Sequence, residues 1–229
     1  MMRLDAGLRW GPTNRAIRVT YPHGGATVVV RIPEGFATCA ADVAAALHTA
    51  VHGVSSHLSC TESDGTFTFA SNAAHFDLEF NPSLRLYLGC GGNPTDTALY
   101  RCTSSAVFVT RSPGRTLSHG FTFGAKLTHA DHNQVALVPL ATWRRWKLGL
   151  HVVAPDLARL RTVLSYALRG LPVTWYRDKT NASPFGYTNW TGKVLATLDS
   201  QTREYVESWL SSPHQTHATV ELSLCETTL

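Results

Sequence analysis

His48 and His52 lie four residues apart in an alanine-rich segment, a spacing that can place two zinc ligands on one face of a helix. The residues between them are Thr-Ala-Val, so the glutamate general base of a zinc metalloprotease is missing. No third ligand stands at a motif spacing from the pair. We therefore interpret both histidines as part of the polar face of a helix, and we expect no metal ion.

His129, Asp131 and His132 form a second compact cluster, which follows a segment with alternating Phe121 and Phe123. An imidazole beside a carboxylate can act as a general base or bind a metal. The cluster also fits a polar loop between two strands, and we prefer this interpretation. A hydrolase that uses these three residues is the third of the functions that we consider.

Cysteine usage is a further source of chemistry. Disulfide frameworks and zinc ribbons need closely spaced pairs, and this chain has no CxxC spacing. Residues 1–5 contain no apolar signal region, so we expect reduced and mostly buried thiols. Cys90 needs a lowered pKa to act as a nucleophile, and we expect it to be structural. The five cysteines are Cys39, Cys60, Cys90, Cys102 and Cys225.

Phosphate-binding and hydrolase motifs are missing from the sequence. The glycine-rich stretch Gly89-Cys-Gly-Gly matches neither a P-loop nor a dinucleotide-binding fingerprint. The chain also has no GxSxG nucleophile elbow. We expect no catalytic residue, no cofactor and no enzymatic activity.

Aromatic and basic side chains crowd the second half of the chain. Trp, Tyr and Arg are enriched where proteins contact each other, and interleaved aromatic and basic residues also stack on bases or sugars. We prefer a protein–protein interface and keep sugar or receptor binding around Trp175 and Trp190 as the alternative. The candidate interface residues are Trp143, Arg144, Arg145, Trp175, Tyr176, Trp190 and Trp209.

The composition indicates a folded protein with little surface charge. Of the 229 residues, 44% are hydrophobic and 16% are charged, below the roughly 25% charged residues of average domains. Residues 1–100 carry six basic and eight acidic side chains, and the rest carries fourteen basic and eight acidic ones. This asymmetry favours head-to-tail contact between copies, and the weak basic excess predicts no nucleic-acid partner. No apolar run reaches the ~18 residues of a membrane helix, so we expect no membrane partner.

Strand patterns dominate the elements that must position these residues. Alternating apolar and polar residues and β-branched runs predict strands. A helix is expected over residues 40–52, with Thr38 as its N-cap, and an amphipathic helix over residues 155–169. A short third helix is expected over residues 200–210. We expect strands at residues 26–32, 66–69, 76–80, 106–110, 120–128, 143–153, 171–176 and 217–226.

Turn and loop residues near 95–118 indicate a boundary between two parts of the chain. We therefore expect an N-terminal strand–helix–strand module over residues 1–105. Residues 106–229 are expected to form a C-terminal β-sandwich with one helix. The predicted fold class is α+β, mainly β, with two amphipathic helices packed on the sheets.

The order of segments in residues 26–90 resembles a module of viral and phage structural proteins. The resemblance rests on Val28-Val-Val-Arg-Ile-Pro-Glu-Gly-Phe-Ala-Thr, the alanine-rich helix, Gly65-Thr-Phe-Thr-Phe and Leu84-Arg-Leu-Tyr-Leu-Gly. The second half is similar in outline to phage distal-tail and baseplate-ring proteins. Its features are a Trp-rich strand, an amphipathic helix, Gly170-Leu-Pro-Val-Thr-Trp-Tyr-Arg-Asp and Trp190-Thr-Gly-Lys-Val.

This resemblance implies a structural subunit of a phage tail, of the distal-tail, baseplate-ring or tail-tube kind, that assembles with copies of itself into a ring. It also implies other virion tail proteins as partners, a location in the virion after assembly in the host cytoplasm, and no catalysis. A receptor- or carbohydrate-binding adhesin of the tail or capsid is the alternative.

Overall fold

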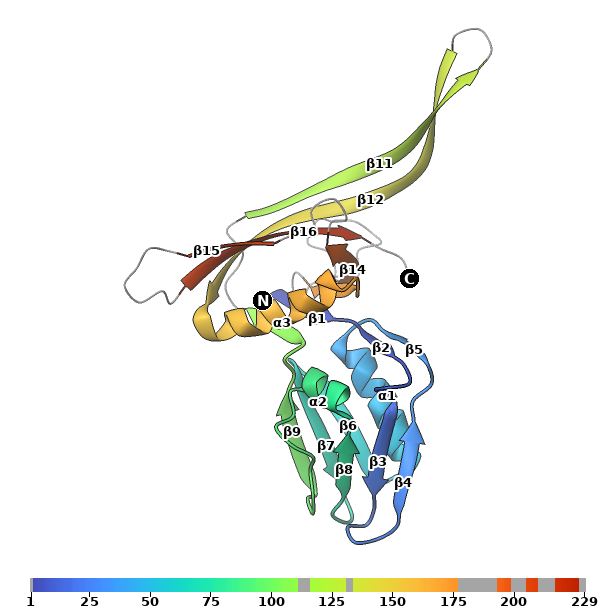
Figure 1. Ribbon diagram of the computed structural model, residues 1–229, viewed down its shortest axis with the longest axis vertical. Coiled ribbons are helices and arrows are strands. Elements are labelled where there is room, and N and C mark those ends of the chain that lie inside the picture. Colours follow the sequence, from blue (N-terminus) through green and yellow to red (C-terminus); the bar gives the residue numbers. More distant parts are fainter. Residues whose placement is uncertain are drawn as a thin grey trace.

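The computed structural model describes residues 2–110, 116–130, 134–176, 193–198, 205–209 and 217–226 (Figure 1). Within these ranges the chain is α+β and mainly β, which confirms the predicted fold class. The described strands form four antiparallel sheets. The described helices are α1 (Ala40–His52), α2 (Pro82–Leu88) and α3 (Ala154–Leu168).

Two three-stranded sheets and one two-stranded sheet form the lower part of the molecule in Figure 1. Alternation produces their strands because every second side chain faces the core: Phe67 and Phe69 of β7 are buried, as are Leu78 and Phe80 of β8. The strand orders are β4–β3–β8, β6–β7–β9 and β2–β5. The strands are β2 (Leu8–Trp10), β3 (Ala16–Thr20), β4 (Thr27–Arg31), β5 (Gly35–Ala37), β6 (Leu58–Ser63), β7 (Thr66–Ser71), β8 (Asp77–Phe80) and β9 (Leu99–Thr103).

Helix α1 has the bounds that its sequence predicts, and it packs against β6. Val43, Leu47 and Val51 recur at four-residue spacing and are buried, so one stripe of the helix faces the core. The predicted N-cap is wrong by one residue: Cys39 occupies this position and makes no side-chain cap. The backbone N–H and hydroxyl of Thr38 instead donate to the carboxylate of Asp42 in the first turn.

Helix α2 is not among the predicted elements, because seven residues are too short for a clear helical period. Its termini carry the local signals: the side chain of Asn81 accepts a hydrogen bond from the Leu84 N–H at 2.9 Å, and Pro82 opens the first turn. Gly89 ends the helix with a φ of 69°. A Cβ atom at Gly89 would lie 2.0 Å from the Thr103 carbonyl oxygen, so only glycine allows this end of α2 to contact β9.

An eight-stranded sheet occupies the rest of the described chain, in the order β10–β1–β13–β14–β16–β12–β11, with β15 also paired to β16. Strand β1 precedes the N-terminal sheets in sequence but pairs with β10 and β13, so it crosses the predicted boundary at residues 105 and 106. Alternation is clear in β16, where Val220, Leu222 and Leu224 are buried. The strands are β1 (Met2–Ala6), β10 (Val107–Thr110), β11 (Thr116–Ala130), β12 (Gln134–Val153), β13 (Val173–Tyr176), β14 (Lys193–Leu198), β15 (Tyr205–Trp209) and β16 (His217–Glu226).

Helix α3 lies along one side of this sheet, where it contacts β1, β10, β12, β14 and β16 (Figure 1). Its sequence predicts the apolar face correctly for Leu157, Leu160, Val163 and Leu164, which are buried. Leu168, at the end of the same predicted face, is instead exposed. The predicted sandwich of two packed sheets in this half stays a prediction.

Strands β11 and β12 form a long antiparallel hairpin with a register shift at Gly124 and Ala125. The strands predicted at residues 120–128 and 143–153 are each only part of it. Pro139, which interrupts the apolar run in the sequence, lies inside β12. Proline removes a hydrogen bond from a central strand, but among the described strands this part of β12 pairs on one side only, with β11.

The helix predicted over residues 200–210 is wrong: residues Tyr205–Trp209 form strand β15 against β16. Tyr, Val and Trp favour extended backbone, and the free edge of β16 supplies the hydrogen bonds. Among the described residues, no helix is long and apolar enough to cross a membrane.

Candidate functional site

The structure removes Trp175 from the candidate interface. Its side chain is 1% exposed and makes an edge-to-face contact with Trp146, with ring centroids 5.5 Å apart. Strand β13 is central in the large sheet, between β1 and β14, so Val173 and Thr174 are buried as well. The expectation of an exposed Trp175 for self-assembly or sugar binding was therefore wrong. Both tryptophans belong to the core of this chain.

The other predicted interface residues are described to different extents. Tyr176 is partly buried, and the guanidinium of Arg3 lies 5.5 Å from the centre of its ring. Arg145 is partly buried on β12. Trp143 and Arg144 lie on β12 and Trp209 on β15, but only their backbone is described, and Trp190 lies outside the described residues. Their role in an interface stays a prediction.

The predicted histidine clusters have different outcomes. His48 accepts a hydrogen bond from the Cys60 N–H at 3.3 Å, and His52 donates one to the Leu58 carbonyl oxygen at 3.3 Å. These bonds tie α1 to β6. His129 lies on β11 with only its backbone described, and Asp131 and His132 lie outside the described residues. Within the described ranges, no group of three or more His, Cys, Asp or Glu side chains is arranged to hold a metal ion.

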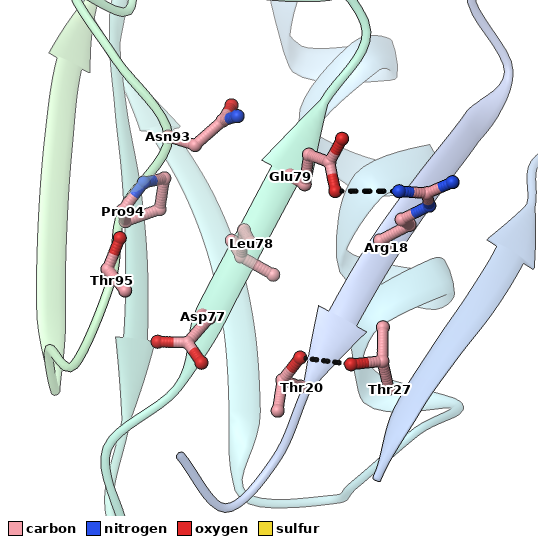
Figure 2. A pocket seen from close by; sticks show the side chains of 9 residues that line it. All are labelled: Arg18, Thr20, Thr27, Asp77, Leu78, Glu79, Asn93, Pro94 and Thr95. Atoms are coloured by element: carbon pink, nitrogen blue, oxygen red, sulfur yellow. Dashed lines mark hydrogen bonds and ion pairs between the residues drawn. The ribbon is translucent and has the colours of Figure 1, made fainter. Parts of the chain in front are cut away.

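A polar groove of about 490 Å³ lies on the outer face of the β4–β3–β8 sheet, and Figure 2 shows the side chains that line it. Period-two alternation creates this face: Ile17 and Val19 of β3 point into the core, which leaves Arg18 and Thr20 outside. Arg18 forms an ion pair with Glu79 at 3.1 Å. The lining residues are Arg18, Thr20, Thr27, Asp77, Leu78, Glu79, Asn93, Pro94 and Thr95.

A chain of histidine and aspartate side chains continues from one end of the groove. His23 Nδ1 lies 2.8 Å from a carboxylate oxygen of Asp77, and the Asp96 N–H donates to the same carboxylate at 2.6 Å. His75 Nδ1 lies 2.8 Å from the Asp96 carboxylate. The hydrogen bond to Asp77 raises the pKa of His23. Slight burial acts to raise the pKa of Asp77, but the bonds from Asp96 and His23 outweigh it and leave that pKa lowered.

The charged side chains of this polar surface are already paired with one another. Each carboxylate in it already accepts a hydrogen bond from a cation, an imidazole or a backbone amide, so binding a ligand there would require exchanging an existing partner. Sequence reasoning did not select these residues. The alternation of Phe76-Asp-Leu-Glu-Phe marks Asp77 as solvent-facing, but its partners come from loops 54 and 19 residues away.

A second polar cluster is buried, and it joins the large sheet to the N-terminal sheets. Arg3 of β1 binds both carboxylate oxygens of Asp5, at 2.6 and 2.8 Å, and Glu62 of β6 at 3.0 Å. Asp5 also accepts from the Ala40 N–H at the start of α1 at 3.1 Å. Burial acts to lower the pKa of Arg3, but Asp5 and Glu62 outweigh it and hold that pKa above its usual value. Since these charged groups are paired with one another and buried, the cluster acts as a structural junction.

Comparison with protein-family models and with curated proteins finds no match to this chain. Neither the groove nor the buried junction brings a nucleophile and a base together among the described side chains. The most prominent feature of the fold is the β11–β12 hairpin, which projects from the rest of the molecule (Figure 1).

Proposed function

We propose that this chain is a structural subunit of a bacteriophage tail, of the distal-tail, baseplate-ring or tail-tube kind, that assembles with copies of itself into a ring in the virion. Other virion tail proteins are its further partners, and it performs no catalysis. The β11–β12 hairpin is the observation that carries assembly. The resemblance of the sequence to phage distal-tail and baseplate-ring proteins selects the phage tail as the setting.

The outer half of the hairpin has too few partners to be stable in water alone. Residues 145–149 of β12 are hydrogen-bonded on both sides, to β11 and β16, and residues 150–153 pair with β16. Residues 134–144 pair with β11 and with no other described strand. Together with residues 121–130 of β11, these residues form an arm. At about 3.3 Å per residue, the arm is roughly 35 Å long. Two-stranded hairpins are marginally stable without further packing, so the arm favours contact with a neighbour.

The sequence of the arm supports the same conclusion. Residues 134–143 contain no charged side chain, and the opposite strand, residues 116–130, contains Lys126 as its single Lys, Arg, Asp or Glu. Proteins ordinarily protect exposed strands with charges, and long uncharged surfaces are typical of interaction sites. Burial of the arm against another copy accounts for both its length and its lack of charge.

Free strand edges give the assembly a route to ring formation. Among the described strands, β11 ends the large sheet and β4 ends the β4–β3–β8 sheet. On β4, Val28 is 44% exposed and Val29 is 52% exposed. Different surfaces on the two sides of a subunit produce head-to-tail contacts, which close into rings when the rotation between subunits allows. The net negative first hundred residues and the net positive remainder suit this contact.

Truncation of the arm tests the proposal. Residues 122–143 are replaced by Asn-Gly, which joins Phe121 to its partner Arg144 through a two-residue turn. We expect negative-stain images of the full chain to show rings, and images of the truncated chain to show single particles. The variant Leu86→Lys changes a residue that is 66% exposed on α2, and it should leave the rings intact.

The proposal fails if the full chain forms neither rings nor tubes, alone or with tail partners, or if the truncated chain assembles as well as the full chain. Far-ultraviolet circular dichroism and the near-ultraviolet signal of the Trp146–Trp175 pair check that the truncated chain is folded.

A further inference from the structure

Two buried cysteines from different elements lie in direct contact. Cys90 follows the end of α2 and Cys102 lies on β9, and their Sγ atoms are 2.6 Å apart. Both residues are buried, with exposed fractions of 8% and 6%. We propose that Cys90 and Cys102 form a reversible disulfide that fastens the segment of residues 91–101 at its base. The sequence instead predicts that both thiols are reduced and that Cys90 has only a structural role.

The surrounding backbone holds both sulfur atoms in place. The Ser104 hydroxyl donates to the Tyr87 carbonyl oxygen at 2.6 Å, and the Ser105 hydroxyl donates to the Leu86 carbonyl oxygen at 2.8 Å. Together with the close approach of Gly89 to Thr103, these bonds fix the end of α2 against β9. A disulfide bond is about 2.05 Å long, so the sulfurs need to approach by only about 0.5 Å.

The electrostatics of the pair give the two thiols different roles. The contact with Cys102 lowers the pKa of Cys90, and this effect exceeds the opposing effect of burial. The same contact, with burial, raises the pKa of Cys102. Tyr100 and Arg85 also act to lower the pKa of Cys90, so we take Cys90 as the nucleophile and Cys102 as the resolving thiol. Burial raises the pKa of the neighbouring Cys60, which keeps that thiol protonated.

Hydrogen peroxide is the oxidant that we assign, because it is small enough to reach a buried thiol. The Cys90 thiolate attacks one peroxide oxygen, and the S–O bond forms as the O–O bond breaks, which gives a sulfenic acid and a hydroxide that is protonated to water. The Cys102 sulfur then attacks Cys90 Sγ. The S–S bond forms as the S–O bond breaks, and the second hydroxide leaves as water with the Cys102 proton. Two thiols are oxidised and one peroxide is reduced to two waters.

The segment between the two cysteines forms one wall of the polar groove (Figure 2). It is tied to β8 by three hydrogen bonds: Phe80 N–H to the Asn93 side chain at 3.1 Å, Leu78 N–H to the Pro94 carbonyl at 3.0 Å, and Asp96 N–H to Asp77 at 2.6 Å. A disulfide at the base of this segment restricts its unfolded conformations. Oxidation should therefore stabilise the wall of the groove.

The test is oxidation of the reduced, full-length protein with stoichiometric hydrogen peroxide at low protein concentration. We expect the count of free thiols to fall from five to three, and peptide mapping to join Cys90 to Cys102. The midpoint of thermal unfolding should rise by roughly 5–10 °C. Hydrogen exchange at the Leu78 and Phe80 amides should slow.

Two variants separate this pair from the other cysteines. Cys60→Ser is the matched control, since it removes a neighbouring buried thiol and should leave the link intact. Cys102→Ser removes the resolving thiol, so Cys90 should remain a sulfenic acid that dimedone labels. The proposal is overturned if the wild-type protein keeps all five thiols or if mapping joins a different pair, and neither result depends on whether a variant folds.

Discussion

Asp5 is the residue on which the junction between the sheets depends. Its carboxylate is fully buried and receives hydrogen bonds from Arg3 of the same strand and from the backbone of Ala40 at the start of α1. Because Arg3 also binds Glu62 of β6, the first strand of the large sheet is attached to both a helix and a sheet of the N-terminal part. Charged groups in such a position are stabilising only while all partners are present.

Removal of Asp5 should therefore be costly. Asp5→Ala leaves Arg3 buried with one acidic partner, and we expect the free energy of unfolding to fall by about 3 kcal/mol, measured by urea denaturation. Arg18→Ala is the matched control: the Arg18–Glu79 pair is exposed, and its loss should cost less than about 1 kcal/mol. Equal losses in the two variants would show that the buried junction has no special role.

The His23–Asp77 pair gives a pH-dependent prediction. The folded state raises the pKa of His23 above its ordinary value because Asp77 favours the imidazolium. The pair therefore stabilises the fold below the ordinary histidine pKa of about 6.5, and this contribution disappears as the pH rises through the raised pKa. Titration by NMR should show the pKa of His23 falling in Asp77→Asn. An unchanged titration would contradict the assigned partner.

At the scale of elements, the termini of α2 determine how the helix meets β9. Gly89 has a positive φ and lies against the Thr103 carbonyl, so a side chain is excluded for two independent reasons. Gly89→Ala should lower the free energy of unfolding by at least about 2 kcal/mol, measured from the denaturant midpoint. Gly92→Ala, where a Cβ meets open space, should change it by less than about 0.5 kcal/mol. A tolerated Gly89→Ala would mean that α2 can move away from β9.

The sequence predicts the elements whose patterns are local. Helix α1 and strand β16 match their predicted bounds, since a regular period and clear end signals coincide in each. Strand β15 was predicted as a helix because its pairing with β16 is a tertiary interaction. The burial of Trp175 likewise depends on tertiary contacts, since the ring packs against Trp146 of β12 and its strand pairs with β1 at the start of the chain.

Local sequence patterns also do not predict the candidate groove. Alternation identifies Asp77 and Glu79 as solvent-facing residues of a strand. It does not bring His23 and Asp96 to the Asp77 carboxylate, or Arg18 to Glu79, because these contacts arise when distant loops and strands meet. The contact between Cys90 and Cys102 has the same origin, since Gly89 and the two serines after Thr103 create it.

At the scale of the whole molecule, the long hairpin and the strand edges left open among the described strands support the proposed assembly better than any single side chain does. The arm extends beyond the sheet that supports it (Figure 1). Residues 134–143 contain no charged side chain of the kind that ordinarily protects an exposed strand from contact with other chains. In the proposed assembly, a second copy covers the arm and stabilises it. The proposed ring is the closed form of that contact.

The mass of the protein in solution tests this account most directly. Sedimentation equilibrium over a range of concentrations should give a mass that rises above the 25.0 kDa of one chain and reaches a fixed multiple of it. The chain with residues 122–143 replaced by Asn-Gly should sediment as a monomer throughout. A full-length chain that stays at the mass of one copy at the highest concentration, both alone and with tail partners, would contradict the account.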